Sequence, residues 1–267
     1  MNGLIKKLKG IDRGDSAAAF PSRITHFQLE RLFRQTRFGT TRPRQGFIEG
    51  KHYIAKCGDW SPYSSNGHVK NEYIVDNIIR GMGFLVPESR LYGLYEGREE
   101  VLVRLAEFKE DAIPLGDYCD KASAVQMDKV FRQTVAVYPL LHLLDALDSF
   151  DGGGWDNILV DAQDRLWFVD NGCSFNYRAR GLPKEWDVFA RRDPKERAHG
   201  FLSLREYPRL FLLRRILGGV PDRVLWRSAL RFDVGRFADS IPTSGYHRKA
   251  LVEYAHSMVA VAKQMSR

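Results

Sequence analysis

The chain has 267 residues, of which 44% are hydrophobic and 28% are charged, a composition typical of an ordinary soluble globular protein. Its length suits one two-lobed domain or two small ones, and no apolar run approaches the roughly 20 residues that a transmembrane helix needs. The three cysteines are too few for a disulfide framework and have no metal-ligand spacing. These features exclude a membrane-spanning protein and a disulfide-stapled secreted domain, and they favour a cytoplasmic location.

The formal net charge of +8 indicates attraction to an anion, such as a nucleotide, an acidic protein or an anionic membrane surface touched peripherally. Basic residues are spread over several clusters, and no basic motif is interleaved with aromatic residues as in RNA- or DNA-binding modules. Nucleic acid is therefore not an expected partner.

Residues 1–23 are expected to form a flexible leader that is basic but lacks the apolar stretch of a secretory signal. Apolar residues spaced as in a helix then predict a short amphipathic helix over 24–37. Two strand-like runs follow, at 47–49 and 52–57, joined by Gly50-Lys51. The segment before them, 39–46, combines small, hydroxyl and basic residues that can offer N–H groups and positive charge to phosphates. Its candidate phosphate-binding residues are Gly39, Thr40, Thr41 and Arg42.

Lys56 lies at the end of the second strand-like run, and Glu72 lies early in a predicted helix over 68–82. A lone strand lysine usually faces solvent. A strand lysine that pairs with a helix glutamate, however, holds the α- and β-phosphates of ATP in kinases. We therefore predict that Lys56 and Glu72 form such a pair.

Two further strands are predicted at 91–95 and 101–105, separated by a turn at 96–98. They complete a small antiparallel sheet with one packed helix, so residues 24–108 are expected to form an N-terminal lobe. The segment 105–108 then becomes the hinge between lobes, and the backbone of Glu107 and Phe108 is the expected partner of an adenine edge.

Residues 109–267 are expected to form a mostly helical second lobe. A long helix is predicted over 124–149, which Pro139 should kink or split. The segment 176–200 is basic, contains glycine and proline, and is expected to form an activation or substrate-binding loop. Three helices are predicted at 202–217, 222–231 and 246–265. The predicted fold is α+β and two-lobed, like that of protein kinases.

The candidate catalytic and metal-binding residues lie in the middle of the second lobe's sequence. A glycine-rich loop over 150–157 precedes two short apolar runs, 158–160 and 166–169, which predict a hairpin, and Asp170 follows the second run. Phosphoryl transfer needs a carboxylate near the incoming hydroxyl, and an amide and another carboxylate to hold Mg²⁺. Asn157 and Asp170 are the candidate metal ligands, and Asp151 is the candidate catalytic carboxylate with Asp156 as its rival.

These segments resemble the HipA-like kinases and the related type II phosphatidylinositol 4-kinases. The likeness covers about residues 37–190, and it rests on the order and spacing of the motifs. Four motifs carry it: the loop and strand 39–56, the helix and turn 71–88, the loop 151–157, and Asp170-Asn171-Gly172.

The resemblance implies that Lys56 contacts the α- and β-phosphates while Glu72 holds it, and that 39–46 covers the phosphates. It also implies that Asp151 orients the acceptor hydroxyl or accepts its proton, and that Asn157 and Asp170 bind Mg²⁺. Two features depart from the family. Asn157 follows Asp151 by six residues rather than five, and glycines replace the basic residue that the family places after the aspartate.

The expected function is that of an ATP- and Mg²⁺-dependent kinase with a protein serine or threonine as acceptor. A pseudokinase, meaning a nucleotide- or partner-binding module without turnover, is the first alternative because of the altered loop. A phosphoinositide or small-molecule kinase, and an enzyme that transfers AMP or another group, also remain open.

Overall fold

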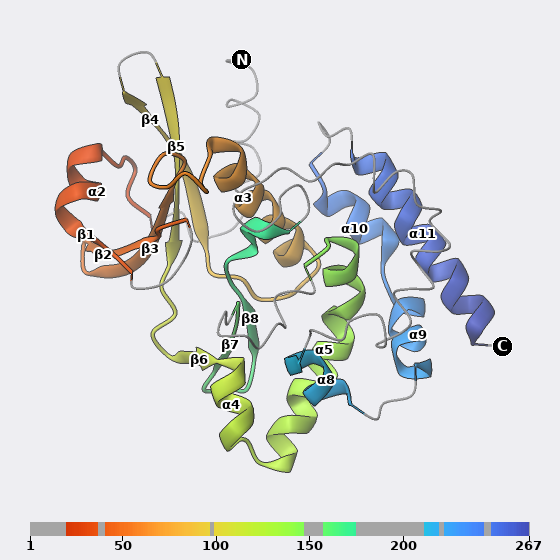
Figure 1. The fold of residues 1–267 in the computed structure, drawn as a ribbon. Coiled ribbons are helices and arrows are strands. Elements are labelled where there is room, and N and C mark those ends of the chain that lie inside the picture. Colours follow the sequence, from red (N-terminus) through yellow and green to blue (C-terminus); the bar gives the residue numbers. More distant parts are fainter. Residues whose placement is uncertain are drawn as a thin grey trace.

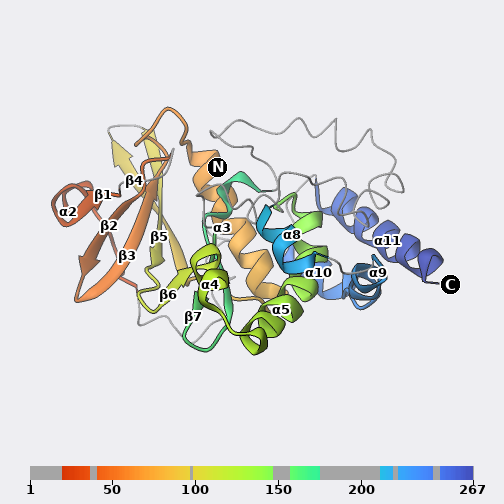
Figure 2. The same cartoon turned by 60° about the horizontal axis from the view of Figure 1, so that its bottom comes forward.

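The computed structural model describes residues 20–36, 41–96, 99–146, 157–174, 211–218, 222–242 and 247–266. A sheet lies on one side of the molecule and a group of helices on the other, with helix α3 (Asn66–Gly81) between them in two different views (Figures 1 and 2). Helix α3 contacts strand β5 (Glu99–Glu107) on one side and helix α10 (Val234–Ser240) on the other. The expected α+β, two-lobed architecture is confirmed.

The first lobe is built on a five-stranded antiparallel sheet with strand order β1-β2-β3-β5-β4. Its inward side chains form an apolar core, in which Tyr53, Val103 and Leu105 are almost fully buried. A short helix, α2, precedes the sheet. The remaining elements of this lobe are α2 (His26–Leu32), β1 (Phe33–Gln35), β2 (Arg44–Ile48), β3 (Lys51–Cys57) and β4 (Ser89–Glu96).

The helix predicted over 24–37 is shorter than expected, because the chain becomes extended at Phe33 and pairs with β2. Thr25 begins α2 with a reciprocal capping box to Gln28. Gly46 permits the close approach at the other end, since a Cβ there would lie 2.3 Å from the Leu32 carbonyl oxygen. Strand pairing therefore overrides the helical periodicity after about two turns.

Residues 20–23 of the expected leader lie in the described part of the chain. Phe20 packs against the ring of Tyr53, with ring centroids 5.5 Å apart. The carbonyl of Pro21 accepts a hydrogen bond from the Tyr92 hydroxyl at 2.8 Å. These contacts attach this segment to the sheet.

Helix α3 serves both lobes. Its residues Val75, Ile78 and Ile79 are buried in the core of the helical lobe, whereas Glu72 points to the sheet and reaches Lys56. The start of the helix is fixed to β5, because the Asn66 side chain donates to the Glu100 carbonyl and accepts from the Leu102 amide. The position of Glu72 is thus set by contacts with both lobes.

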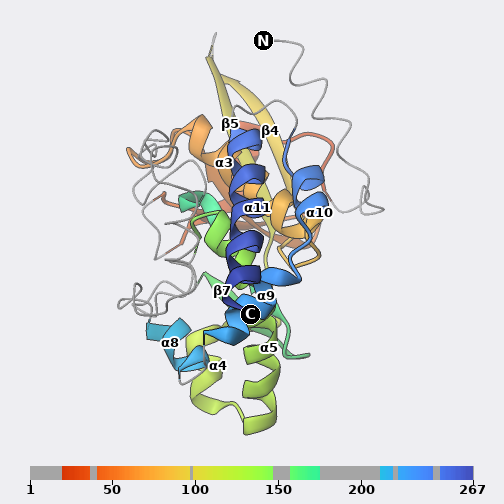
Figure 3. The same ribbon diagram turned by 90° about the vertical axis from the view of Figure 1, so that its right-hand side faces the viewer.

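The second lobe combines a three-stranded antiparallel sheet, β6-β7-β8, with six helices in its described part. Helix α11 crosses the outer side of this lobe, and it faces the viewer in Figure 3. It contacts α9, α10 and α5. The additional elements are β6 (Ala112–Pro114), α4 (Leu115–Lys121), α5 (Ala124–Leu143), β7 (Ile158–Asp161), β8 (Leu166–Phe168), the 3₁₀ turn η2 (Asn171–Cys173), α8 (Phe211–Leu217), α9 (Arg223–Leu230) and α11 (His247–Met265).

Of the two outcomes predicted for Pro139, a kink or a split of the long helix, the split is wrong, because α5 runs unbroken from Ala124 to Leu143; the kink stays a prediction. Proline has no amide hydrogen, so the carbonyl of Val135, four residues earlier, loses its usual helical partner. The hydroxyl of Ser228 on α9 donates to that carbonyl instead. The interruption in α5 is therefore satisfied by a neighbouring helix.

Replacing Ser228 with alanine should lower the free energy of unfolding by about 1 kcal/mol, because the Val135 carbonyl would lose its donor. Urea unfolding measures the change. Ser257 on α11 is the control, since its exposed hydroxyl donates only to the Glu253 carbonyl of its own helix. Equal effects of the two alanine substitutions would contradict the role given to Ser228.

No helix in the described ranges is both long and apolar enough to cross a membrane. The expected substrate loop, 176–200, and the first part of the helix predicted at 202–217 lie outside those ranges. Helices α9 and α11 agree with the predictions at 222–231 and 246–265 to within a residue or two. Helices α4 and α10 were not predicted.

Candidate active site

Lys56 is the last residue but one of strand β3, and its side chain is only 4% exposed. Its ammonium group donates to both oxygens of the Glu72 carboxylate, at 3.1 and 2.9 Å. Glu72 is itself 1% exposed. The structure therefore brings together the lysine and glutamate that the sequence singled out, from different elements sixteen residues apart.

Asp170 reaches the same ammonium from the other lobe. It follows β8, takes a left-handed backbone conformation with φ 53°, and begins the turn η2. Its Oδ1 lies 2.5 Å from Lys56 Nζ, while its side chain remains 41% exposed. Aspartate is one of the few residue types that adopts this conformation readily. Asp170 thus joins a buried ion pair to the solvent-facing side of the site.

Arg104, on strand β5, is a second buried cation of the site. It lies opposite Lys56 in the strand pairing, and its Nη1 is 3.1 Å from the Glu72 carboxylate. Its Nη2 pairs with the carboxylate of Asp76, one turn after Glu72 on α3. The guanidinium therefore bridges two acids and fixes α3 against the sheet.

The electrostatic balance of this cluster leaves one negative charge. Two cations, Lys56 and Arg104, face three carboxylates, those of Glu72, Asp76 and Asp170. Four of these five groups are buried, and Asp170 is the carboxylate of the cluster whose side chain is exposed to solvent. A cation bound at Asp170 would balance the cluster.

The pKa values of the cluster follow from the same contacts. Burial alone would lower the pKa of the Lys56 ammonium, but the carboxylates of Asp170 and Glu72 outweigh it and raise that pKa above its ordinary value. Burial alone would raise the pKa of Glu72, but Lys56 and Arg104 lower it to about 2. Burial raises the pKa of Asp76, against the effect of Arg104. The lysine and the glutamate are therefore both charged at neutral pH.

Helix α3 also holds the loop that carries Asp170. The Asn71 side chain donates to the carbonyls of Gly172 and Ser174, at 3.1 and 2.7 Å. The amide of Asn171 is buried and donates to Asp76 Oδ1 at 2.9 Å. Of the first two residues of the Asp-Asn-Gly motif, Asn171 therefore points inward and holds the loop to α3, whereas Asp170 faces outward.

Gly172 lies where this loop passes closest to α3. A Cβ at this position would be 2.6 Å from His68 Nε2 and 3.2 Å from Glu72 Oε2. Both neighbours are buried, so neither side chain has free space into which it can move. Only glycine fits between the loop and the helix.

The substitution Gly172→Ala should therefore lower the free energy of unfolding by about 1–3 kcal/mol, the usual range for overpacking. Chemical denaturation measures it. Gly235→Ala on α10 is the matched control, because its nearest neighbour would lie at 3.4 Å, an ordinary contact. A Gly172→Ala protein as stable as the Gly235→Ala protein would contradict the close approach.

Asn157, the other candidate metal ligand, opens strand β7. Its carbonyl accepts the Val169 amide at 2.9 Å, so the hairpin places Asn157 directly across from the residue before Asp170. Its side chain is half-buried. The described residues contain no group of three or more His, Cys, Asp or Glu side chains that could hold a metal ion. A cation at this hairpin would have one amide and one carboxylate from the described chain.

The candidate phosphate loop is described from Thr41 onward, and Gly39 and Thr40 lie outside the described ranges. Thr41 is buried, whereas Arg42 is exposed with φ 50°. The base of the loop is closed, because the Thr36 amide donates to the Pro43 carbonyl at 2.9 Å. The roles of these four residues remain predictions.

The backbone amides of both hinge residues already donate hydrogen bonds within the protein. The amide of Glu107 donates to the Glu88 carbonyl at 2.9 Å, and that of Phe108 donates to the His52 carbonyl at 3.0 Å. The Phe108 ring packs on His52, with centroids 4.2 Å apart. An adenine edge would therefore have to use groups other than these two amides.

The candidate catalytic carboxylates, Asp151 and Asp156, lie outside the described residues. The sequence interpretation missed Arg104 and Asp76, which complete the buried cluster. The sequence contains a local signal for each of these two residues. Arg104 interrupts the apolar run 101–105, and Asp76 follows Glu72 by four residues on the buried side of a helix.

Comparisons with known proteins give a fold likeness at low identity. The structure is similar to the Helicobacter pylori proinflammatory kinase CtkA, with 12% identity and a TM-score of 0.47, covering 86% of this chain and 90% of that one. It is also similar to a presumed aminoglycoside phosphotransferase from Ralstonia eutropha JMP134, with 11% identity and a TM-score of 0.38, covering 89% and 96%. No family model and no curated protein matches the sequence. The functional argument therefore rests on the site itself.

Proposed function

We propose that this protein is an ATP- and Mg²⁺-dependent kinase that transfers a phosphoryl group to a hydroxyl. The observation that carries the proposal is the burial of Lys56 between two carboxylates, Glu72 on α3 and Asp170 after the β7–β8 hairpin. Burying an ammonium group is costly unless acids surround it. A lysine held between the lobes in this way is suited to bind the α- and β-phosphates of a nucleotide.

The residues present fit a magnesium ion. Mg²⁺ is commonly held by one or two carboxylates together with substrate phosphates, and Asp170 and Asn157 supply one carboxylate and one amide from adjacent ends of the hairpin. The Asp170 carboxylate is the acid of the cluster that solvent reaches, so it is accessible to a cation. When bound, Mg²⁺ neutralises charge on the β- and γ-phosphates.

The remaining roles follow from position. Lys56 has three N–H donors, and the one that now meets Asp170 would serve a phosphate oxygen once that carboxylate is a metal ligand. Arg104 keeps Glu72 in place from β5. Asp151, with Asp156 as the alternative, would orient the acceptor hydroxyl. Gly39, Thr40, Thr41 and Arg42 would cover the phosphates.

We assign the acceptor as a protein serine or threonine on the resemblance to the HipA-like kinases. The positive net charge is compatible with an acidic protein partner. The same site chemistry would serve a phosphoinositide or a small-molecule hydroxyl, so the acceptor must be tested directly.

The test is transfer of radiolabelled phosphate from [γ-³²P]ATP with Mg²⁺, offered in parallel to a protein mixture, to phosphoinositide vesicles and to small hydroxyl compounds. Label in the protein arm that disappears with Asp170→Asn supports the proposal. Asp145→Asn is the control, because Asp145 is exposed and has φ 52°, nearly the same backbone conformation as Asp170. Label only in another arm would overturn the acceptor, and ATP binding without transfer would indicate a pseudokinase.

A further inference from the structure

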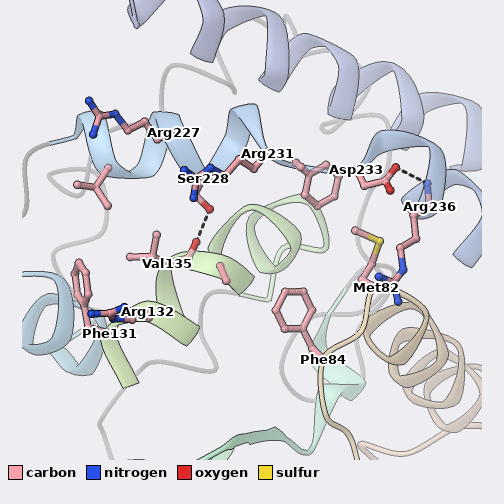
Figure 4. A pocket seen from close by; sticks show the side chains of 13 residues that line it. Met82, Phe84, Phe131, Arg132, Val135, Arg227, Ser228, Arg231, Asp233 and Arg236 are labelled. Carbon is pink, nitrogen blue, oxygen red and sulfur yellow. Dashed lines mark hydrogen bonds between the residues drawn. The ribbon is translucent and has the colours of Figure 1, made fainter. Parts of the chain in front are cut away.

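A cavity of about 670 Å³ lies on the helical lobe, away from the Lys56 cluster. Helices α9 and α10 form one wall, and α5 and the segment after α3 form the other (Figure 4). Part of the lining is apolar. Met82, Phe84, Phe131 and Phe232 line it, and each is partly exposed while packed against the core. The cavity is thus a preformed recess with an apolar floor.

The polar part of the lining is strongly basic. Four arginines and a single acid, Asp233, are among the 13 residues that line the cavity. Asp233 accepts the Arg236 amide at 2.9 Å and caps α10, so its charge is placed at that helix start. The lining therefore has a large excess of positive charge.

The four arginines differ in their partners. Arg132 pairs with Asp128 on its own helix, and Arg236 donates to the Gly81 carbonyl at the end of α3. Arg227 and Arg231, both exposed on and just after α9, have no ion pair within the described ranges. Figure 4 shows Arg231 on the same wall as Ser228 and Asp233, across from Phe84. Arg227 and Arg231 are thus the two arginines of the lining whose guanidinium groups have no partner among the described residues.

We propose that this cavity binds a small amphiphile with an apolar body and an anionic end. Pockets for small ligands commonly have volumes of roughly 300–1,000 Å³ with mostly apolar walls and a few polar groups that fix orientation. The phenylalanine and methionine side chains would cover the apolar body. Arg227 and Arg231 would bind the anion, which is either a carboxylate or a phosphate, since arginine recognises both.

The test is isothermal titration calorimetry of the full chain with decanoate, decyl phosphate and decanol. We expect the two anions to bind at least about tenfold more tightly than the neutral alcohol, because a hydrogen-bonded charge contributes that much. The stronger of the two anions identifies the head group. Equal binding of decanol and both anions would overturn the proposal.

Two sets of variants assign the binding to this cavity. The double substitution Arg227→Gln and Arg231→Gln should weaken anion binding about tenfold or more, whereas Arg223→Gln, on the same helix but outside the lining, should not. Ala136→Phe should weaken binding of all three probes, because Ala136 is an exposed residue of the lining and a larger side chain there occupies part of the cavity. Unchanged affinity in the Arg227/Arg231 variant or in Ala136→Phe would overturn the proposal.

Discussion

Replacing Lys56 with methionine should reduce phosphoryl transfer by about a hundredfold or more, the usual loss when one charge-stabilising donor is removed from a transferring group. The ammonium is the one cation that contacts both Glu72 and Asp170 in the described site. Methionine keeps the length and the apolar stem but cannot donate to a phosphate. Transfer of radiolabel from ATP under saturating Mg²⁺ measures the effect.

The fold should survive this change, because Glu72 keeps Arg104 as a partner and Asp170 reaches water. Lys51→Met provides the control. Lys51 lies on the same strand, is exposed, and should be replaceable without loss of activity. If the Lys56→Met protein is folded by circular dichroism and still transfers phosphate at the wild-type rate, the assignment of Lys56 is wrong.

Replacing Arg104 with methionine should lower the free energy of unfolding by about 3–5 kcal/mol, the cost of leaving buried charges without a partner. Asp76 loses its cation, and Glu72 is left with Lys56 alone. Arg104→Lys should recover only part of the loss, because an ammonium cannot bridge two carboxylates as a planar guanidinium does. Guanidinium chloride unfolding measures both variants.

Arg90→Met on β4 is the matched control, since Arg90 has no ion pair within the described part of the chain and its replacement should change stability little.

Acid unfolding gives a second measurement of the same bridge. The pKa of Glu72 falls from its ordinary value of 4.5 to about 2 in the folded protein. The ionised Glu72 therefore contributes its full stabilisation above pH 4.5, and this stabilisation is lost as the pH falls toward about 2. Without Arg104 the pKa of Glu72 should rise, so acid unfolding should begin at a higher pH. An Arg104→Met protein as stable as the control would contradict the bridge.

Several parts of the site could be predicted because they follow from local sequence patterns. A lysine at the end of a strand-like run, a glutamate at the start of an apolar-faced helix and an aspartate after a short hairpin each have a local signature. Their order along the chain suggested that they meet, and the structure brings Lys56, Glu72 and Asp170 into contact. The proposed roles of these residues remain to be tested.

Arg104 could not be assigned from the sequence in the same way. An arginine within an apolar strand is equally compatible with a solvent-facing position at the edge of a sheet. Only the pairing of β5 with β3 places Arg104 beside Lys56. Strand β1 was missed for a similar reason. Its three residues continue a helical pattern, and they become extended only because β2 lies beside them. In both cases the partner strand, which is distant in sequence, decides the outcome.

The basic cavity could likewise not be predicted from the sequence. Its lining comes from the segment after α3, from α5, and from α9, α10 and the residues between them, and nothing in the separate segments indicates that they share a recess. One contact between α9 and α5 is made by the Ser228 hydroxyl, which replaces the donor that Pro139 lacks. Pro139 predicted a disturbance in the helix, but the compensating residue lies almost ninety positions away.

The most direct test of the proposed site is the affinity for ATP with and without Mg²⁺, measured for the wild-type protein, Asp170→Asn and Asp145→Asn. Asparagine keeps the left-handed backbone conformation that Asp170 adopts but removes its charge. We expect Mg²⁺ to tighten ATP binding by about tenfold or more in the wild type and in Asp145→Asn, and to have no such effect in Asp170→Asn. An unchanged gain from Mg²⁺ in Asp170→Asn would show that the metal binds elsewhere.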